Sequence, residues 1–192
     1  MLVGENRHRT IQRDYYRGLV TNSVLSGYSG RLNQEIRIKR GLSYGAASQL
    51  ETRRTVGPFV ASAETKNQSA AQVADLLLGE VSGLATKPVP DIELNPRKAV
   101  VVGNFARGLE TNSGLAAQVA SLGIYGINFD EINRYIGNVQ SITASDVQGF
   151  AGSHLDAKTT SVVIVGNAKE FLPELRQKYP QVESDSHGGA WL

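Results

Sequence analysis

The chain has 192 residues, enough for one sizeable domain with its own hydrophobic core. Its formal net charge of +2 is too small to indicate a nucleic-acid partner. The absence of cysteine excludes a disulfide framework, a thiolate nucleophile and a cysteine-based zinc site. No apolar run approaches the ~20 residues that a membrane-spanning helix needs, so we expect a soluble protein without a membrane partner. Its compartment, cytoplasm or periplasm, stays open.

The N-terminal part of the chain predicts a helix after a short extended segment. Residues 2–11 are expected to form a strand remnant and a loop, and residues 12–26 a helix with one apolar stripe. The sequence Gly-Tyr-Ser-Gly at residues 27–30 then breaks this helix from the next one.

The most informative stretch is residues 29–49, which reads as a helix, a glycine stop and a strand. Opposite charges four residues apart should pair along the helix, Arg31 with Glu35 and Glu35 with Lys39. Gly41 supplies the left-handed residue that ends a helix. Almost no loop is left between the helix and the strand that follows.

This reversal brings two polar side chains close to each other. Arg37 lies one turn before the helix end, and Tyr44 lies three residues past Gly41, so we expect both side chains to point into one space. Arginine offers a fixed positive charge and several donors, and tyrosine offers a hydroxyl. Such a pair suits a peptide carbonyl or a developing oxyanion. The alternative is that Arg37 is a helix-surface charge and Tyr44 a core aromatic.

The remaining pattern predicts an α+β domain, with helices packed mainly on one face of a mostly antiparallel sheet. Strands are expected at residues 42–52, 58–65, 159–165 and 181–185, the first two joined by a hairpin loop at 53–57. One helix is expected after the capping pair Ser69 and Gln72, and another from Asn95 and Pro96 to Leu109. Further helices are expected at 114–122, 130–139, 143–155 and 167–179. Thr143 and Asp146 are expected to cap the helix at 143–155. We assign residues 1–185 to a single domain and residues 186–192 to a flexible tail.

The chain offers no recognisable means of activating water. Its three histidines, His8, His154 and His187, lie far apart, and neither His-x-x-Glu-His nor His-Glu-x-x-His occurs. Ser153 is adjacent to His154, but adjacent helix residues do not face each other. We therefore expect no bound metal or cofactor in this chain and no peptide hydrolysis by the chain alone.

One segment resembles a known family. Residues 31–46 are similar to the signature of the second homologous domain of the pitrilysin and insulinase (M16) zinc peptidases, with the LuxS/MPP-like metallohydrolase fold: Arg-Leu-Asn-Gln-Glu-Ile-Arg-Ile-Lys-Arg-Gly-Leu-Ser-Tyr-Gly-Ala. In that family the first domain carries zinc on a His-x-x-Glu-His motif, and the second lends an Arg and a Tyr, seven residues apart, to the active cleft. Arg37 and Tyr44 have this spacing. A strand precedes the first helix in that family, and only residues 1–3 remain for it here, so the resemblance implies a chain cut from a longer one.

The resemblance implies the substrate-binding, non-zinc half of a zinc metalloendopeptidase. The partner would be a homologous domain or subunit that bears His-x-x-Glu-His and holds the zinc. Tyr44 would hydrogen-bond the substrate carbonyl or oxyanion, and Arg37 would hold Tyr44 or a substrate carbonyl in place. The isolated domain is then expected to self-associate or to be weakly stable. The alternative is a catalytically inert structural or interaction subunit with the same fold.

Overall fold

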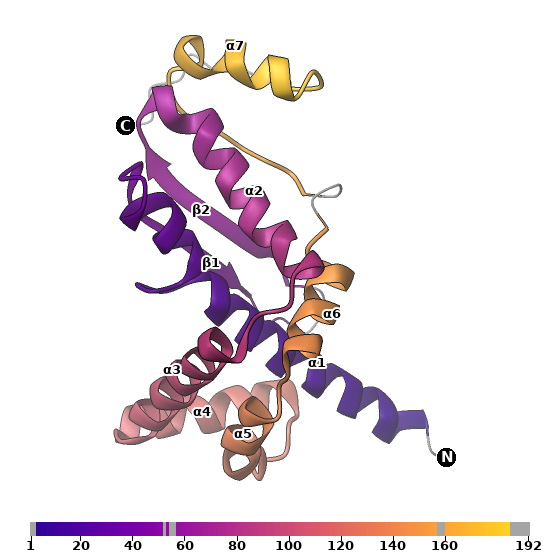
Figure 1. Cartoon of the computed structure of the whole chain (residues 1–192). Coiled ribbons are helices and arrows are strands. Elements are labelled where there is room, and N and C mark those ends of the chain that lie inside the picture. Colours follow the sequence, from indigo (N-terminus) through magenta and orange to yellow (C-terminus); the bar gives the residue numbers. More distant parts are fainter. Residues whose placement is uncertain (1–2, 52, 54–56, 157–159, 185–192) are drawn as a thin grey trace.

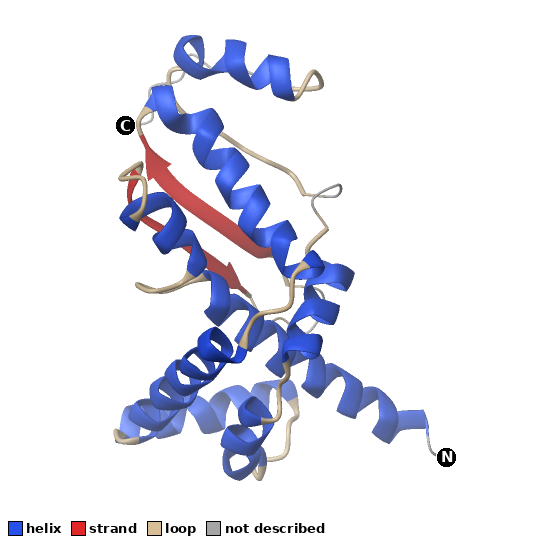
Figure 2. Ribbon diagram, viewed as in Figure 1, coloured by secondary structure: helices blue, strands red, loops and turns tan. Residues whose placement is uncertain are grey.

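The computed structural model describes residues 3–51, 53, 57–156 and 160–184. It has an α+β fold, as the sequence predicts, in which helices pack against one face of a small antiparallel sheet (Figures 1 and 2). The elements in chain order are α1 (Val3–Leu25), the π-helix η1 (Asn33–Ile38), β1 (Ser43–Leu50), β2 (Phe59–Thr65), the 3-10 turn η2 (Asn67–Ser69), α2 (Ala70–Thr86), α3 (Asp91–Leu109), α4 (Asn112–Tyr125), α5 (Glu131–Gln140), α6 (Ala144–His154) and α7 (Ala168–Lys178).

The sheet consists of β1 and β2 paired antiparallel, with Ala46 opposite Ala63 and Leu50 opposite Phe59. The register shifts near the start of β1, between Ser43 and Ala46. Alternate residues of β2 pack against the core, where α2 lies alongside the sheet (Figure 2). This alternation follows from the two-residue period of a strand that has one face buried. Both expected hairpin strands are therefore confirmed, and their loop lies mostly outside the described residues.

The main core is built around α1, which packs against α3, α6 and β1. The largest fully buried side chains are Leu25, Leu32, Ile36, Leu84 and Leu94, followed by Val20 and Val24. A second, smaller core joins Phe171 and Leu175 of α7 to the first turn of α2. The helices α3, α4 and α5 gather at one end of the molecule and α7 lies at the other (Figure 1). Burial of Leu32 and Ile36 anchors η1, and with it the segment that the sequence singled out.

Two expected boundaries in the N-terminal half are wrong. Residues 3–11 are helical, because α1 begins at Val3, and they contain no strand remnant. The side chain of Ser69 makes no capping hydrogen bond, because residues 67–69 form a separate 3-10 turn before α2.

The start of α3 also differs from the prediction. This helix begins at Asp91 rather than after Asn95, so Pro96 lies inside it. The backbone N–H groups of Glu93 and Leu94 both donate to the Pro90 carbonyl, and the Leu94 side chain is fully buried. Core packing therefore outweighs the one backbone hydrogen bond that a proline removes.

The C-terminal third holds two further corrections and one confirmation. Residues 160–165 form no strand, and Val163 and Val165 are 83% and 93% exposed. Residues 181–184 form no strand either, while 159 and 185–192 lie outside the described residues. A run of β-branched residues needs a neighbouring strand to pair with, and in the described part of the chain the sheet consists of β1 and β2 alone. The capping pair of Thr143 and Asp146 is present in full.

Within the described part of the chain, no helix is long and apolar enough to cross a bilayer.

Candidate functional site

The site forms where η1 turns into β1. The N–H of Lys39 donates to the Gln34 carbonyl at 3.0 Å, a π-helical hydrogen bond of the kind often found at functional sites. Gly41 then takes a left-handed conformation with φ of 61°, and its N–H donates to the Arg37 carbonyl at 3.0 Å. The chain is thereby reversed within two residues and enters β1.

This reversal brings Arg37 and Tyr44 together. The guanidinium carbon of Arg37 lies over the Tyr44 ring, 5.0 Å from its centroid, which is within cation–π range. Tyr44 is 90% exposed, which rules out the alternative that it is a core aromatic. Neither the guanidinium nor the Tyr44 hydroxyl makes a hydrogen bond or ion pair with a described residue. Their donors are therefore accessible to a ligand.

A second tyrosine, which the sequence analysis missed, contacts the same guanidinium. Tyr28 is 71% exposed, and the Arg37 guanidinium carbon lies 5.4 Å from its ring centroid. We call these three residues the Tyr28–Arg37–Tyr44 cluster. The signal in the sequence is an aromatic residue between the two glycines of Gly-Tyr-Ser-Gly, a segment that otherwise indicates only a break between helices.

Asn33 connects the backbones that carry the two tyrosines. Its Nδ2 donates to the Gly27 carbonyl at 3.0 Å, and its Oδ1 accepts from the Ala46 N–H at 2.9 Å. The side chain is 9% exposed, so both hydrogen bonds are largely shielded from water. Gly27 takes a positive φ of 87°, which lets the loop turn back toward η1. Sequence reasoning missed Asn33, since a single asparagine beside Leu32 carries no motif.

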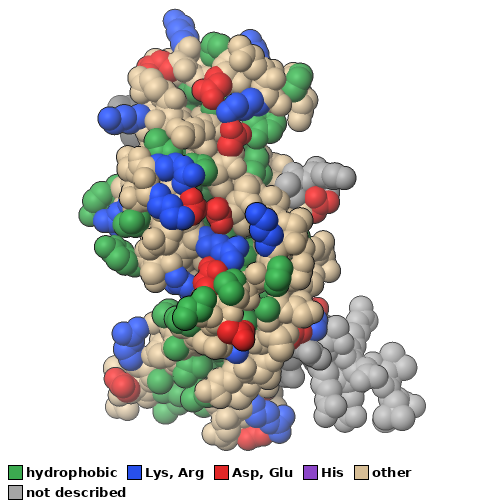
Figure 3. All heavy atoms as spheres, in the orientation of Figure 1, with side chains coloured by type: hydrophobic (Ala, Val, Ile, Leu, Met, Phe, Trp, Pro, Cys, Tyr) green, Lys and Arg blue, Asp and Glu red, His purple; other side chains and the backbone are tan. Residues whose placement is uncertain are grey.

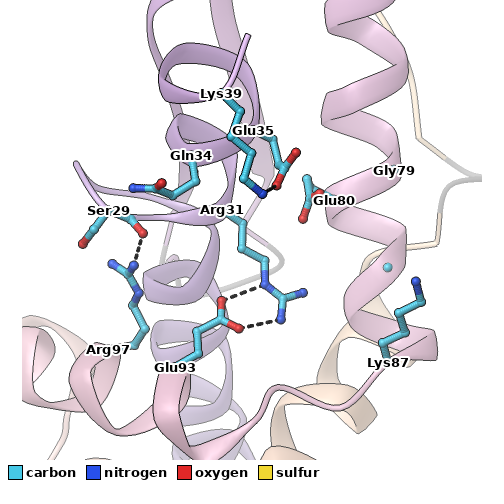
Figure 4. Close-up of a pocket in the computed structure, with 11 residues that line it drawn as sticks. Ser29, Arg31, Gln34, Glu35, Lys39, Gly79, Glu80, Lys87, Glu93 and Arg97 are labelled. Carbon is cyan, nitrogen blue, oxygen red and sulfur yellow. Dashed lines mark hydrogen bonds and ion pairs between the residues drawn. The ribbon is translucent and has the colours of Figure 1, made fainter.

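A polar cavity of about 520 Å³ lies between the η1 segment, α2 and α3, and none of the three cluster residues lines it (Figure 4). Basic and acidic side chains are interspersed over this middle region of the surface (Figure 3). Arg31 makes a bidentate ion pair with Glu93 of α3, at 2.7 and 2.8 Å, in place of the expected pair with Glu35. Glu35 instead accepts from Lys39, as expected, and from Arg40, and these hydrogen bonds lower its pKa. The Arg31–Glu93 ion pair thus ties the start of the η1 segment to α3, and the Glu35 contacts lie within that segment.

Glu80 of α2 faces the same cavity and has no ion pair or hydrogen bond within the described ranges. Its pKa is raised, first because burial disfavours the charged carboxylate and then because of the charge on Glu35. The nearby cations Arg31 and Lys39 offset this rise only in part.

The described residues hold no group of three or more His, Cys, Asp or Glu side chains that is suited to a metal ion. Ser153 donates its hydroxyl to the Gly149 carbonyl at 2.9 Å, and the His154 ring lies against Phe150, so the two do not form a nucleophile–base pair. The fold and the site together define an α+β domain that offers a cation and hydroxyl donors to a ligand.

Comparison with known proteins agrees with the assignment to an α+β domain. The family model described as "Peptidase M16 inactive domain" matches residues 6–101, half of the chain, and the chain therefore belongs to the M16 peptidase family as its inactive domain. An uncharacterised zinc protease of Streptomyces coelicolor is 24% identical over 162 residues, which are 84% of this chain and 35% of that protein. The chain thus spans about a third of the length of this relative.

Solved structures share the fold. The M16 inactive-domain structure from Pseudomonas fluorescens superposes with a TM-score of 0.69 and 23% identity, over 75% of this chain and 35% of that one. A chain of complex III2 from Candida albicans superposes with a TM-score of 0.65 and 15% identity, over 73% and 36%.

Proposed function

We propose that this chain is the substrate-binding, non-zinc half of an M16-type zinc metalloendopeptidase. The observation that carries the proposal is the contact between Arg37 and the exposed Tyr44, whose donors no described residue occupies. Membership of the inactive-domain family and the similarity to a zinc protease support it. The described residues offer no ligand set for zinc, so the ion would be held by a homologous domain or subunit with His-x-x-Glu-His.

In this proposal the two side chains act on a scissile peptide held between this chain and its zinc-bearing partner. When bound in the partner, zinc supplies a polarised carbonyl and an activated water. The Tyr44 hydroxyl donates to the carbonyl oxygen, and this hydrogen bond strengthens as the oxygen becomes an oxyanion. Arg37 holds the Tyr44 ring by its cation–π contact and directs its remaining N–H groups to a neighbouring carbonyl of the peptide.

The test is reconstitution with the homologous chain that carries His-x-x-Glu-His. We expect cleavage of an unstructured peptide with both chains present and none with either one alone. Equal cleavage by the zinc-bearing chain with or without this one would contradict the proposal.

A second candidate is an inert structural subunit. A fold of the same kind occurs in a chain of complex III2 of Candida albicans, so it is also used within a large assembly. The two candidates differ in the partner, because an intact His-x-x-Glu-His there supports the peptidase and a degraded motif supports the scaffold. Assembly with the partner but no cleavage of any peptide would favour the scaffold.

A further inference from the structure

We infer that Tyr28 is a positioning residue for Arg37, and that Asn33 sets the spacing between the Tyr28 loop and the Tyr44 strand. This inference rests on the proposed function of Arg37 and Tyr44. Its geometry can nevertheless be tested without any peptidase activity.

The first step concerns what restrains the guanidinium. Arg37 makes no side-chain hydrogen bond or ion pair with the residues that the structure describes, so the two tyrosine rings are its only specific neighbours there. Contact with ring faces leaves the N–H groups at the edge of the guanidinium plane available. With one ring removed, a long flexible side chain would sample more orientations, and its donors would meet a substrate carbonyl less often.

The second step concerns Tyr28 itself. Among the described residues, this ring is not part of either hydrophobic core, and it is mostly exposed. Core packing therefore does not explain its position, whereas the contact with Arg37 does. Tyr28 and Tyr44 make no ring contact with each other in the described structure, so the guanidinium links them.

The third step concerns Asn33. Its amide joins Gly27, the residue before Tyr28, to Ala46, two residues after Tyr44, and it lies on η1 one turn before Arg37. One side chain thus fixes three backbones relative to one another. An aspartate at this position keeps the acceptor for the Ala46 N–H but sets a carboxylate oxygen against the Gly27 carbonyl. That substitution releases the Tyr28 loop selectively.

The experiment uses the labelled 192-residue chain and NMR of the Arg37 side chain, because aromatic rings shift the resonances of protons that lie over their faces. We expect upfield-shifted Arg37 δ-methylene protons in the wild type and in Tyr28→Phe, and a smaller upfield shift in Tyr28→Leu and Asn33→Asp. The matched control is Phe129→Leu, the loss of another exposed ring at a distant position, which should leave Arg37 unchanged. Unchanged Arg37 resonances in Tyr28→Leu would overturn the inference.

A kinetic arm in the reconstituted peptidase separates positioning from folding. Tyr28→Phe should keep wild-type kcat/KM, whereas Tyr28→Leu should lower it by up to about 10²-fold, as expected for a misplaced catalytic group. Thermal melts of both variants should match that of the wild type. Equal activity of Tyr28→Leu and Tyr28→Phe would count against a positioning role. If no combination of chains cleaves a peptide, the proposed function fails while the NMR arm still decides the geometry.

Discussion

The guanidinium carbon of Arg37 lies 5.0 Å from the ring centroid of Tyr44, although the two residues belong to a helix and to the strand that follows it. Gly41 makes this contact by reversing the chain between them. The seven-residue spacing thereby places both side chains at the surface, with donors that no described residue occupies.

The first prediction concerns the Tyr44 hydroxyl. Tyr44→Phe removes one donor and keeps the ring that contacts Arg37. In the reconstituted peptidase we expect kcat to fall by about 10²–10³, as for other single oxyanion donors. KM should change less, since this hydrogen bond forms mainly in the transition state. Steady-state kinetics beside a thermal melt measure both effects. Wild-type turnover in Tyr44→Phe would exclude a catalytic role.

The second prediction concerns Gly41. Its φ of 61° lies in the left-handed region, and a Cβ there would meet no atom within 4 Å. Gly41→Ala should therefore cost about 1 kcal/mol of unfolding free energy through backbone strain alone. Gly79→Ala is the matched control, because that helical glycine also has open space around it and should gain about 0.5–1 kcal/mol. Urea unfolding measures both, and the same sign for the two variants would contradict this account of the turn.

The third prediction concerns Asp146, the third residue of α6, which forms a capping box with Thr143. Burial alone would raise its pKa, but hydrogen bonds from Thr143 and Arg17 outweigh this and lower the pKa to about 2. A carboxylate with a lowered folded-state pKa stabilises the fold at neutral pH, and this contribution is lost as the pH falls from about 4 to 2. Asp146→Asn should therefore cost about 2 kcal/mol at pH 7, and the difference from the wild type should shrink toward pH 2.

Urea titrations at several pH values measure this effect. The control is Asp91→Asn, at the exposed first turn of α3, where the change should be small at every pH. A cost for Asp146→Asn that does not vary with pH would show that the charge of Asp146 contributes nothing to stability.

The fourth prediction has the opposite sign. Because burial and then the charge of Glu35 raise the pKa of Glu80, the folded chain holds this proton more tightly than the unfolded chain does. Ionised Glu80 therefore destabilises the fold above its folded-state pKa, and the effect vanishes below the ordinary carboxylate range. Glu80→Gln should raise the unfolding midpoint at pH 7 and leave it unchanged at pH 3. A lower midpoint at pH 7 would instead mean that Glu80 has a cationic partner in solution.

The fifth prediction concerns metal. The described residues offer no group of ligands at metal spacing, so the dialysed chain should retain no stoichiometric zinc. Elemental analysis by mass spectrometry checks this, with the reconstituted two-chain peptidase as the positive control. One tightly held zinc per isolated chain would contradict the assignment of the metal to the partner.

The features that depend on residues close together in the chain could be predicted from the sequence. These features include Gly41 after η1, strand β1 and the contact of Arg37 with Tyr44. A glycine in the left-handed conformation ends a helix and sets the direction of the chain that follows, so a few neighbouring residues are enough to predict this turn. The capping box of Thr143 and Asp146 was equally local, since its two hydrogen bonds span three residues.

Features that depend on contacts between residues far apart in the chain became evident from the folded structure. Helix α3 begins early because Leu94 is buried and Glu93 binds Arg31, 62 residues away in the sequence. Residues 160–165 have the composition of a strand but no neighbour to pair with, and pairing rather than composition makes a strand. Tyr28 and Asn33 could be assigned to the candidate site only from the structure, because they contact residues that folding brings near. Their roles depend on which backbones and side chains lie beside them after folding, and neither Gly-Tyr-Ser-Gly nor the order of residues 31–46 reveals those neighbours.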